Sequence, residues 1–172
     1  ITRLHHCIAA VRECPVPVIA RVNGYCIGGA LELAAACDLR IAADHARFGM
    51  PEVRLGIPSV IEAALLPRLM GAGRARWLLL TGEMIDAAEA LRWGLVERVV
   101  NAQTLDNEVD QALEGILAGG AEAIRAQKRL NRAYEELPLE DAISLSIEAF
   151  AHAYATGEPQ RMMRDYLARR RK

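Results

Sequence analysis

The sequence predicts an α/β core that is followed by a helical region. Short β-branched and apolar runs alternate with helix-forming segments, and two strand–helix–strand steps occur near the N-terminus. Such alternation is typical of α/β folds. From Thr104 onward the apolar pattern is helical almost to the end. We therefore predict an α/β core over residues 1–100 and a helical region over residues 101–172.

Proline and glycine set the predicted boundaries in the first part of the chain. The segment Pro15-Val16-Pro17 ends an amphipathic helix and leads into a run typical of a buried strand. Asn23-Gly24 breaks that strand, and Gly28-Gly29 precedes a strongly helix-forming run. The predicted elements are helix 1–14, strand 18–22, helix 30–36, strand 39–43, extended segment 46–50, helices 59–70, 74–80 and 86–93, strand 95–100, and helices 104–118, 121–134, 139–155 and 159–169.

Two segments match the capping-box pattern, in which a small polar residue precedes a glutamate by three positions. Ser59 with Glu62 predicts the start of one helix, and Asp86 with Glu89 predicts the start of another. In such a box the first side chain accepts a hydrogen bond from a backbone N–H of the first helical turn.

The Gly28-Gly29 turn in front of a helix is the first candidate site. Peptide N–H groups in the first turn of a helix lack partners and can bind an oxygen that carries negative charge. Glu32 lies in this first turn, so the segment combines an anion-stabilising backbone with a carboxylate. The alternative is that the glycines serve packing and that the helix dipole alone favours the glutamate.

Glu52 and Glu62 are the other acidic candidates. Glu52 follows Pro51 in a segment that can approach the Glu32 turn, because sequential elements are usually neighbours in space. The alternative for Glu52 is an ordinary exposed loop or helix-start glutamate. Glu62 has a structural explanation in the capping box with Ser59, and we expect it to act there.

Charge and hydropathy exclude several classes of function. The chain has 21 Lys and Arg and 22 Asp and Glu, a formal net charge of −1. A nucleic-acid-binding protein usually shows a basic excess, so we predict no nucleic-acid partner. The basic run at residues 169–172 is most simply a solvated helix end. No apolar run approaches the ~20 residues that span a bilayer, so we expect no membrane span, and we expect no signal peptide.

The four cysteines, Cys7, Cys14, Cys26 and Cys37, form no CxxC pair and lie among apolar residues. They are typical of small core residues in a reduced, intracellular protein. The histidines show no ligand spacing, since His5-His6 are adjacent and point apart on a helix, so we predict no metal site. The predicted location is the cytoplasm, with the mitochondrion as the alternative.

Two long motifs resemble the crotonase (enoyl-CoA hydratase/isomerase) superfamily. The first runs from Pro17 to Asp38 and contains Gly28-Gly29-Ala30-Leu31-Glu32. The second runs from Ala46 to Gly56 and contains Pro51-Glu52. The segment from Leu80 to Val96 and the helical tail are also similar to the family, so the resemblance covers essentially the whole chain.

The resemblance implies a fold, a ligand and a site. The fold is a ββα-superhelix core of the ClpP/crotonase type with a C-terminal helical oligomerisation region that builds homotrimers, often paired into hexamers. The ligand is an acyl-CoA of fatty acid metabolism, with coenzyme A as part of the substrate and no separate cofactor. The Gly29 N–H is implied to form half of the oxyanion hole, and Glu32 and Glu52 match the glutamates that hold and activate water. The implied substrate-binding residues are Gly28, Tyr25, Pro51 and Ile57.

The presence of both glutamates favours a lyase that adds water to a 2-enoyl-CoA. The alternatives are an isomerase or another crotonase-type enzyme that uses one acid, and a non-catalytic oligomeric CoA-binding scaffold. Family members carry further chain before this point, which is expected to supply the second oxyanion-hole N–H and much of the CoA pocket. If that portion is absent, we expect weak or no activity. Residues 57–64 replace a glycine-rich stretch of many hydratases, which leaves the acyl specificity open.

Overall fold

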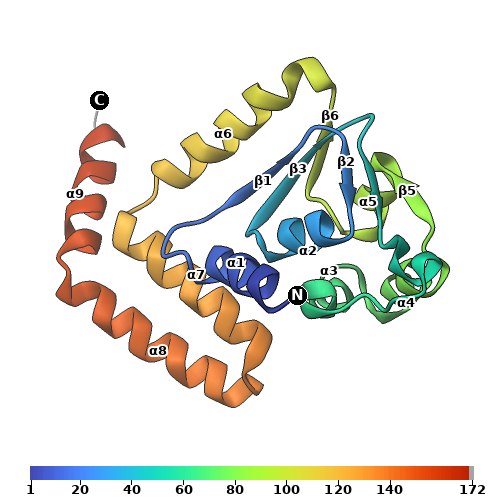
Figure 1. Cartoon of the computed structure of the whole chain (residues 1–172). Coiled ribbons are helices and arrows are strands. Elements are labelled where there is room, and N and C mark those ends of the chain that lie inside the picture. The colour runs from blue at the N-terminus through green and yellow to red at the C-terminus, as the bar shows by residue number, and fades with distance from the viewer. Residues whose placement is uncertain (171–172) are drawn as a thin grey trace. The chain divides into compact units, whose positions relative to one another are not determined.

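Six short strands form two three-stranded sheets within residues 1–170, the part of the chain that a computed structural model describes (Figure 1). The first sheet has the order β1-β3-β6, and both of its pairs are parallel. The second has the order β2-β4-β5, with β2 parallel to β4 and β4 antiparallel to β5. The strands are β1 (Ile19–Val22), β2 (Tyr25–Ile27), β3 (Leu39–Ala43), β4 (Arg47–Gly49), β5 (Met84–Asp86) and β6 (Arg98–Val100).

Helical segments separate most of these strands, as the alternating pattern predicts. The α-helices are α1 (Thr2–Glu13), α2 (Gly29–Ala36), α3 (Leu66–Met70), α4 (Ala72–Thr81), α5 (Ala87–Trp93), α6 (Leu105–Leu117), α7 (Ala121–Glu136), α8 (Leu139–Ala155) and α9 (Glu158–Arg170). The 3₁₀ segments are η1 (Pro51–Leu55), η2 (Ile61–Leu65) and η3 (Ala102–Thr104). Among the described residues, none of these helices combines the length and apolar character needed to cross a bilayer.

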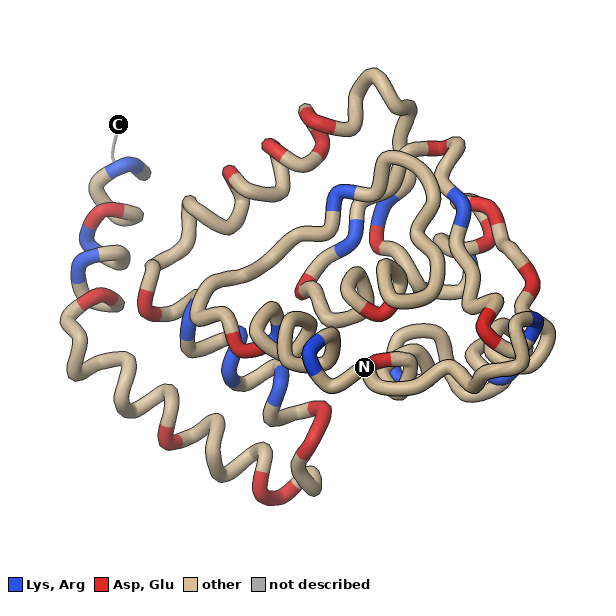
Figure 2. Tube along the Cα trace, viewed as in Figure 1, with Lys and Arg blue, Asp and Glu red and all other residues tan. Residues whose placement is uncertain are grey.

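The chain divides into two compact units, residues 1–111 and the residues from Ala112 onward. In the second unit α7 packs against α8, and α8 packs against α9. Glu158 accepts hydrogen bonds from the backbone N–H groups of Ala123 and Glu122 at the start of α7, and these bonds lower the pKa of its carboxyl group. Figure 2 shows a series of basic residues along α7. The oligomerisation role predicted for residues 101–172 stays a prediction, and the basic run at residues 169–172 extends beyond the described residues.

The pairing of β2 with β4 places the ends of two segments side by side. Ile27 is opposite Gly49 in the parallel register, and the Gly28 N–H donates to the Gly49 carbonyl oxygen at 3.0 Å. The chain therefore leaves β4 beside the turn that starts α2. This places Pro51 and Glu52, which follow directly, next to the Gly28 turn.

A single apolar cluster holds α2 against this sheet. Leu31 of α2, Phe48 of β4 and Met50 are essentially fully buried in the same cluster as Leu66 of α3 and Leu78 of α4. Because buried side chains pack at crystal-like density, such a cluster leaves the first turn of α2 little freedom relative to the end of β4.

The structure confirms most of the predicted elements and corrects two. The strand predicted over residues 95–100 forms only over Arg98–Val100. The helix predicted over residues 59–70 is wrong at its start, since residues 59–60 are not helical and η2 precedes α3. Ile61 has φ +44°, which is incompatible with a continuous α-helix, and Pro67 stands in the first turn of α3, where its missing N–H is tolerated. Strands β2 and β5, three residues each, were not predicted.

Candidate active site

The first turn of α2 offers an unpaired peptide N–H group. Gly28 is the N-cap with φ +57°, a conformation that favours glycine, and its own N–H is used by Gly49. Gly29 is the first helical residue, and its N–H has no acceptor within residues 1–170. The predicted anion-binding position at Gly29 is therefore open to a ligand oxygen.

Glu32 lies in the same helical turn and is 4% exposed. The backbone N–H of Ala63, which donates to the Val60 carbonyl oxygen at 3.0 Å, also lies near the Glu32 carboxylate. Burial, followed by the charges of Glu52 and Glu62, raises the pKa of the Glu32 carboxyl group, and the nearby Ala63 N–H offsets part of this effect. A raised pKa brings a carboxyl group closer to the pH range in which it can both give and accept a proton.

Glu52 approaches the same turn from the segment that follows β4, the strand that pairs with β2. It stands in η1, directly after Pro51, and its Oε2 accepts a hydrogen bond from Ser59 Oγ at 2.9 Å. Its Oε1 lies against Gly28, because a Cβ atom built there would come within 2.5 Å of that oxygen. A Cβ built on Gly29 would lie 4.0 Å from Glu32 Oε2. Both carboxylates thus flank the same pair of glycines.

Glu62 is a third buried carboxylate, and its predicted role as a capping residue is wrong. Its Oε1 is 2.7 Å from Nδ1 of His5 in α1, while its Oε2 is buried and has no hydrogen-bond partner within the described chain. Ser59 does not cap a helix either, because its hydroxyl group donates to Glu52 and η2 has no side-chain cap. The left-handed conformation of Ile61 turns the chain between these two residues.

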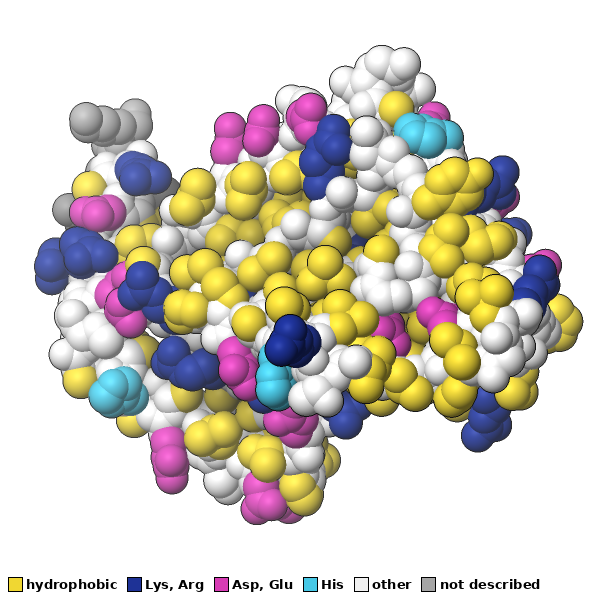
Figure 3. Space-filling model, viewed as in Figure 1, with side chains coloured by type: hydrophobic (Ala, Val, Ile, Leu, Met, Phe, Trp, Pro, Cys, Tyr) yellow, Lys and Arg dark blue, Asp and Glu magenta, His cyan; other side chains and the backbone are white. Residues whose placement is uncertain are grey.

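The other predicted substrate-binding residues differ in how far their side chains are buried. Pro51 is half-buried beside Glu52, and the Ile57 N–H donates to the Glu52 carbonyl oxygen at 3.2 Å. The side chains of Ile57 and Tyr25 are largely exposed, at 55% and 80%. Figure 3 shows that hydrophobic side chains gather on the surface over β2 and the segment that follows β4. An apolar ligand portion therefore has surface to contact near the site.

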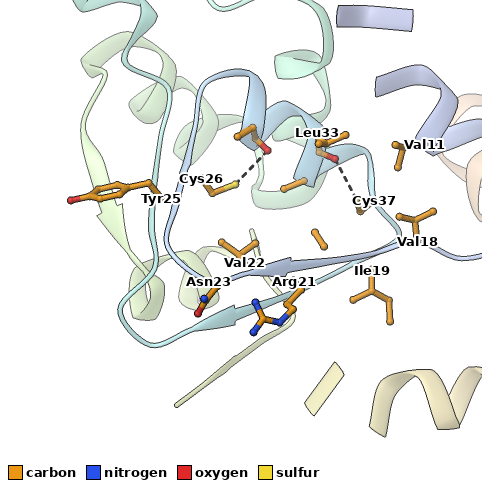
Figure 4. A pocket seen from close by; sticks show the side chains of 13 residues that line it. Val11, Val18, Ile19, Arg21, Val22, Asn23, Tyr25, Cys26, Leu33 and Cys37 are labelled. Carbon is orange, nitrogen blue, oxygen red and sulfur yellow. Dashed lines mark hydrogen bonds between the residues drawn. The ribbon is translucent and has the colours of Figure 1, made fainter. Parts of the chain in front are cut away.

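A separate groove of about 380 Å³ lies between β1 and α2 and is lined mostly by apolar side chains (Figure 4). The thiol groups of Cys26 and Cys37 donate to the carbonyl oxygens of Ala30 and Leu33. Burial, with a smaller contribution from Cys37, raises the pKa of the Cys26 thiol to about 12, so it is no nucleophile at neutral pH. None of the three glutamates lines this groove.

The four cysteines are free, and no group of three or more possible metal ligands occurs within residues 1–170. Sequence reasoning missed two hydrogen-bond partners of the carboxylates, Ser59 and His5, and the position of the Ala63 N–H near Glu32. No local pattern signals these contacts, because His5 and Glu62 are 57 positions apart and meet only in the folded chain.

Comparisons with known proteins place these motifs in a family. The model of the enoyl-CoA hydratase/isomerase family matches residues 2–172. The crotonyl-CoA hydratase of Syntrophomonas wolfei is 42% identical over 156 residues, which are 90% of this chain and 60% of that protein. The short-chain-enoyl-CoA hydratase of Clostridium acetobutylicum is 37% identical with the same coverage.

The structural similarity is equally extensive. The crystal structure of an enoyl-CoA hydratase from Bacillus anthracis has a TM-score of 0.94 at 32% identity and covers 98% of this chain and 66% of its own. The chain spans about 60% of the length of the curated relatives it matches.

Proposed function

Because the chain belongs to the enoyl-CoA hydratase/isomerase family, we propose that it adds water across the C2=C3 double bond of a 2-enoyl-CoA thioester. The observation that carries this proposal is the placement of two carboxylates, Glu32 and Glu52, at one glycine turn whose Gly29 N–H is unpaired. Family membership alone does not identify the reaction, since one fold hosts several chemistries.

The Gly29 N–H stabilises the negative charge that develops on the thioester oxygen. When the oxygen of water attacks C3, electron density moves through C2 to the thioester oxygen, which becomes an enolate oxygen. A donor aimed at that oxygen stabilises the transition state more than the substrate, and one such donor typically contributes roughly 3–4 kcal/mol. The family resemblance implies a second N–H donor from another part of the family's chain.

Glu32 and Glu52 carry out the two proton transfers of the reaction. One carboxylate accepts a proton from the attacking water, and C2 receives a proton from a carboxyl group, so that one H and one OH are added and no electrons are exchanged. Burial and then the charge of Glu52 raise the pKa of the Glu32 carboxyl group, which suits Glu32 to give and accept a proton. This chemistry needs no cofactor, and coenzyme A enters only as part of the substrate.

The assembly and location of the protein are part of the proposal. The exposed apolar residues of α8 support association of like chains, among them Ile147 and Phe150. We propose a homotrimer or a hexamer of paired trimers. The free cysteines agree with the intracellular, cytoplasmic location predicted from the sequence.

The test is turnover of crotonyl-CoA by the protein at its natural length, followed as loss of the enoyl thioester absorbance. Water addition supports the hydratase function. Conversion of a 3-enoyl-CoA into a 2-enoyl-CoA without water addition would instead identify an isomerase. Binding of CoA without turnover of either substrate would identify the scaffold.

A further inference from the structure

A single turn of the chain contacts both carboxylates of the proposed pair. The segment Ser59–Ala63 donates to Glu52 through the Ser59 hydroxyl group, and its Ala63 backbone N–H, which donates to the Val60 carbonyl oxygen, also lies near the Glu32 carboxylate. The two glutamates stand on different elements, η1 and α2, so this turn connects them.

The Ser59 hydrogen bond selects an orientation of the Glu52 carboxylate. Ser59 Oγ lies 2.9 Å from Oε2, which is good geometry for an O–H donor and an ionised acceptor. With Oε2 held in this way, Oε1 is the oxygen that lies against Gly28 at the start of α2. Rotation of the carboxylate out of its plane would break the hydrogen bond to Ser59 and move the other oxygen away from Gly28.

The turn is itself fixed from both sides. Ile61 has φ +44°, which is a strained conformation for a β-branched residue and persists only where the surroundings impose it. The next residue, Glu62, is buried and bonded to His5 of α1 at 2.7 Å. Ala63 is also buried and belongs to the apolar cluster of the first unit. A turn held in this way can hold Ser59 in place.

We propose that Ser59 is a positioning residue for Glu52, which aligns one carboxylate oxygen with the Gly28-Gly29 turn where water is activated. The inference rests on the proposed hydratase function and assigns Ser59 a part in it. A hydroxyl group suits this task because it donates to a carboxylate while carrying no charge of its own.

The experiment compares Ser59→Ala with Ser59→Thr and Ser59→Cys in the protein at its natural length. For Ser59→Ala we expect kcat to fall about tenfold to a hundredfold, with KM changed by no more than about twofold, because the lost contact orients a reacting group. Ser59→Thr keeps the hydroxyl donor and should restore most of kcat. Ser59→Cys keeps a weak donor, so an intermediate kcat is expected and is also informative if the alanine variant does not fold.

Ser146→Ala is the matched control, because the Ser146 hydroxyl group donates to the Ile143 carbonyl oxygen within α8. It should leave kcat unchanged. Wild-type kcat in Ser59→Ala, beside an active wild-type protein, overturns the positioning role and leaves the hydratase function standing.

A readout that does not depend on activity separates the two proposals. If the wild-type protein does not hydrate enoyl-CoA, the hydratase function fails, and a crystal structure of Ser59→Ala still decides the role of Ser59. A Glu52 carboxylate that has turned away from Gly28 supports that role, whereas a carboxylate that keeps its place overturns it.

Discussion

Two segments of the chain share one sequence pattern and use it differently. Asp86 stands in front of α5, and its Oδ1 accepts a hydrogen bond from the Glu89 backbone N–H at 2.7 Å. Ser59 stands in the same relation to Glu62, but its hydroxyl group donates to Glu52 at 2.9 Å and caps nothing. The first segment starts a helix, and the second serves a carboxylate.

The difference lies in what each side chain can do and what surrounds it. A carboxylate only accepts hydrogen bonds, whereas a hydroxyl group also donates them. The Asp86 side chain meets unpaired N–H groups at the start of a helix, which need an acceptor. Ser59 faces a carboxylate, which needs a donor. The capping-box pattern predicts the contact correctly at Asp86, where no other group competes for the side chain. It fails at Ser59, where the Glu52 carboxylate of the candidate site competes for the hydroxyl group.

The largest expected effect comes from removing the carboxylates that the Ser59 segment contacts. Glu52→Gln and Glu32→Gln should each lower kcat for enoyl-CoA hydration by about 10²- to 10⁴-fold, because an amide cannot exchange a proton as a carboxyl group does. Steady-state kinetics with crotonyl-CoA measures the effect. Glu89→Gln, in the segment that only starts a helix, is the control and should retain kcat. Near-normal turnover in either site variant would remove that glutamate from the mechanism.

Exchanging the two polar residues tests the comparison itself. Ser59→Asp puts a carboxylate beside Glu52 where a donor is needed, so we expect kcat to fall by about tenfold or more through displacement of Glu52. Asp86→Ser keeps a good N-cap and should change the free energy of unfolding by less than ~0.5 kcal/mol, with kcat unchanged. Kinetics and thermal unfolding of both variants measure this. Equal effects of the two exchanges would contradict the distinction.

A smaller effect is expected from a matched pair of variants at two glycines with positive φ, one near each segment. Gly28 (φ +57°) has Glu52 Oε1 at 2.5 Å from the position of a Cβ, whereas Gly94 (φ +78°) ends α5 and has the Leu69 carbonyl oxygen at 3.3 Å. Both Gly28→Ala and Gly94→Ala should lower the free energy of unfolding by about 1–2 kcal/mol, since alanine is strained in this conformation. Gly28→Ala alone should also reduce kcat, by about tenfold, because Glu52 must shift. A Gly94→Ala variant with the same loss of kcat would refute the assignment.

How far the sequence predicts the molecule follows from the range of the interactions involved. The crotonase fold and the residues Gly29, Glu32 and Glu52 were predicted, because long ordered motifs carry them. The cap at Asp86 was predicted correctly because it depends on neighbours three positions away. The role of Ser59 was not, because its partner depends on how η1 folds beside it.

The two missed strands have a similar explanation. β2 and β5 have three residues each, so their sequences carry little periodicity, and pairing with β4 defines them. His5 and Glu62 meet across 57 positions, a distance over which a local pattern says nothing. Functional sites contain many such long-range contacts, so predictions from local sequence patterns fail there first.

The smallest expected effect concerns the proton affinity of Glu32. Burial raises the pKa of the Glu32 carboxyl group most, the charge of Glu52 adds to it, and the charge of Glu62 adds less. Removal of either charge should therefore lower this pKa toward its ordinary value, and Glu52→Gln should lower it more than Glu62→Gln. A ¹³C NMR titration of the Glu32 carboxyl group in both variants measures the order, with Glu114→Gln in α6 as the control.

The sign of the accompanying stability change follows from linkage. A carboxyl group with a raised pKa in the folded state binds its proton more tightly there than in the unfolded chain. Its contribution to stability is therefore present below the unfolded pKa and is lost as the pH rises through the folded pKa of Glu32. In Glu62→Gln the folded pKa of Glu32 lies closer to its unfolded pKa, so the pH range between the two becomes narrower. Less stability should therefore be lost as the pH rises through that range. A Glu32 midpoint that stays in place in Glu62→Gln would mean that Glu62 acts on the turn through His5 alone and contributes no charge to the site.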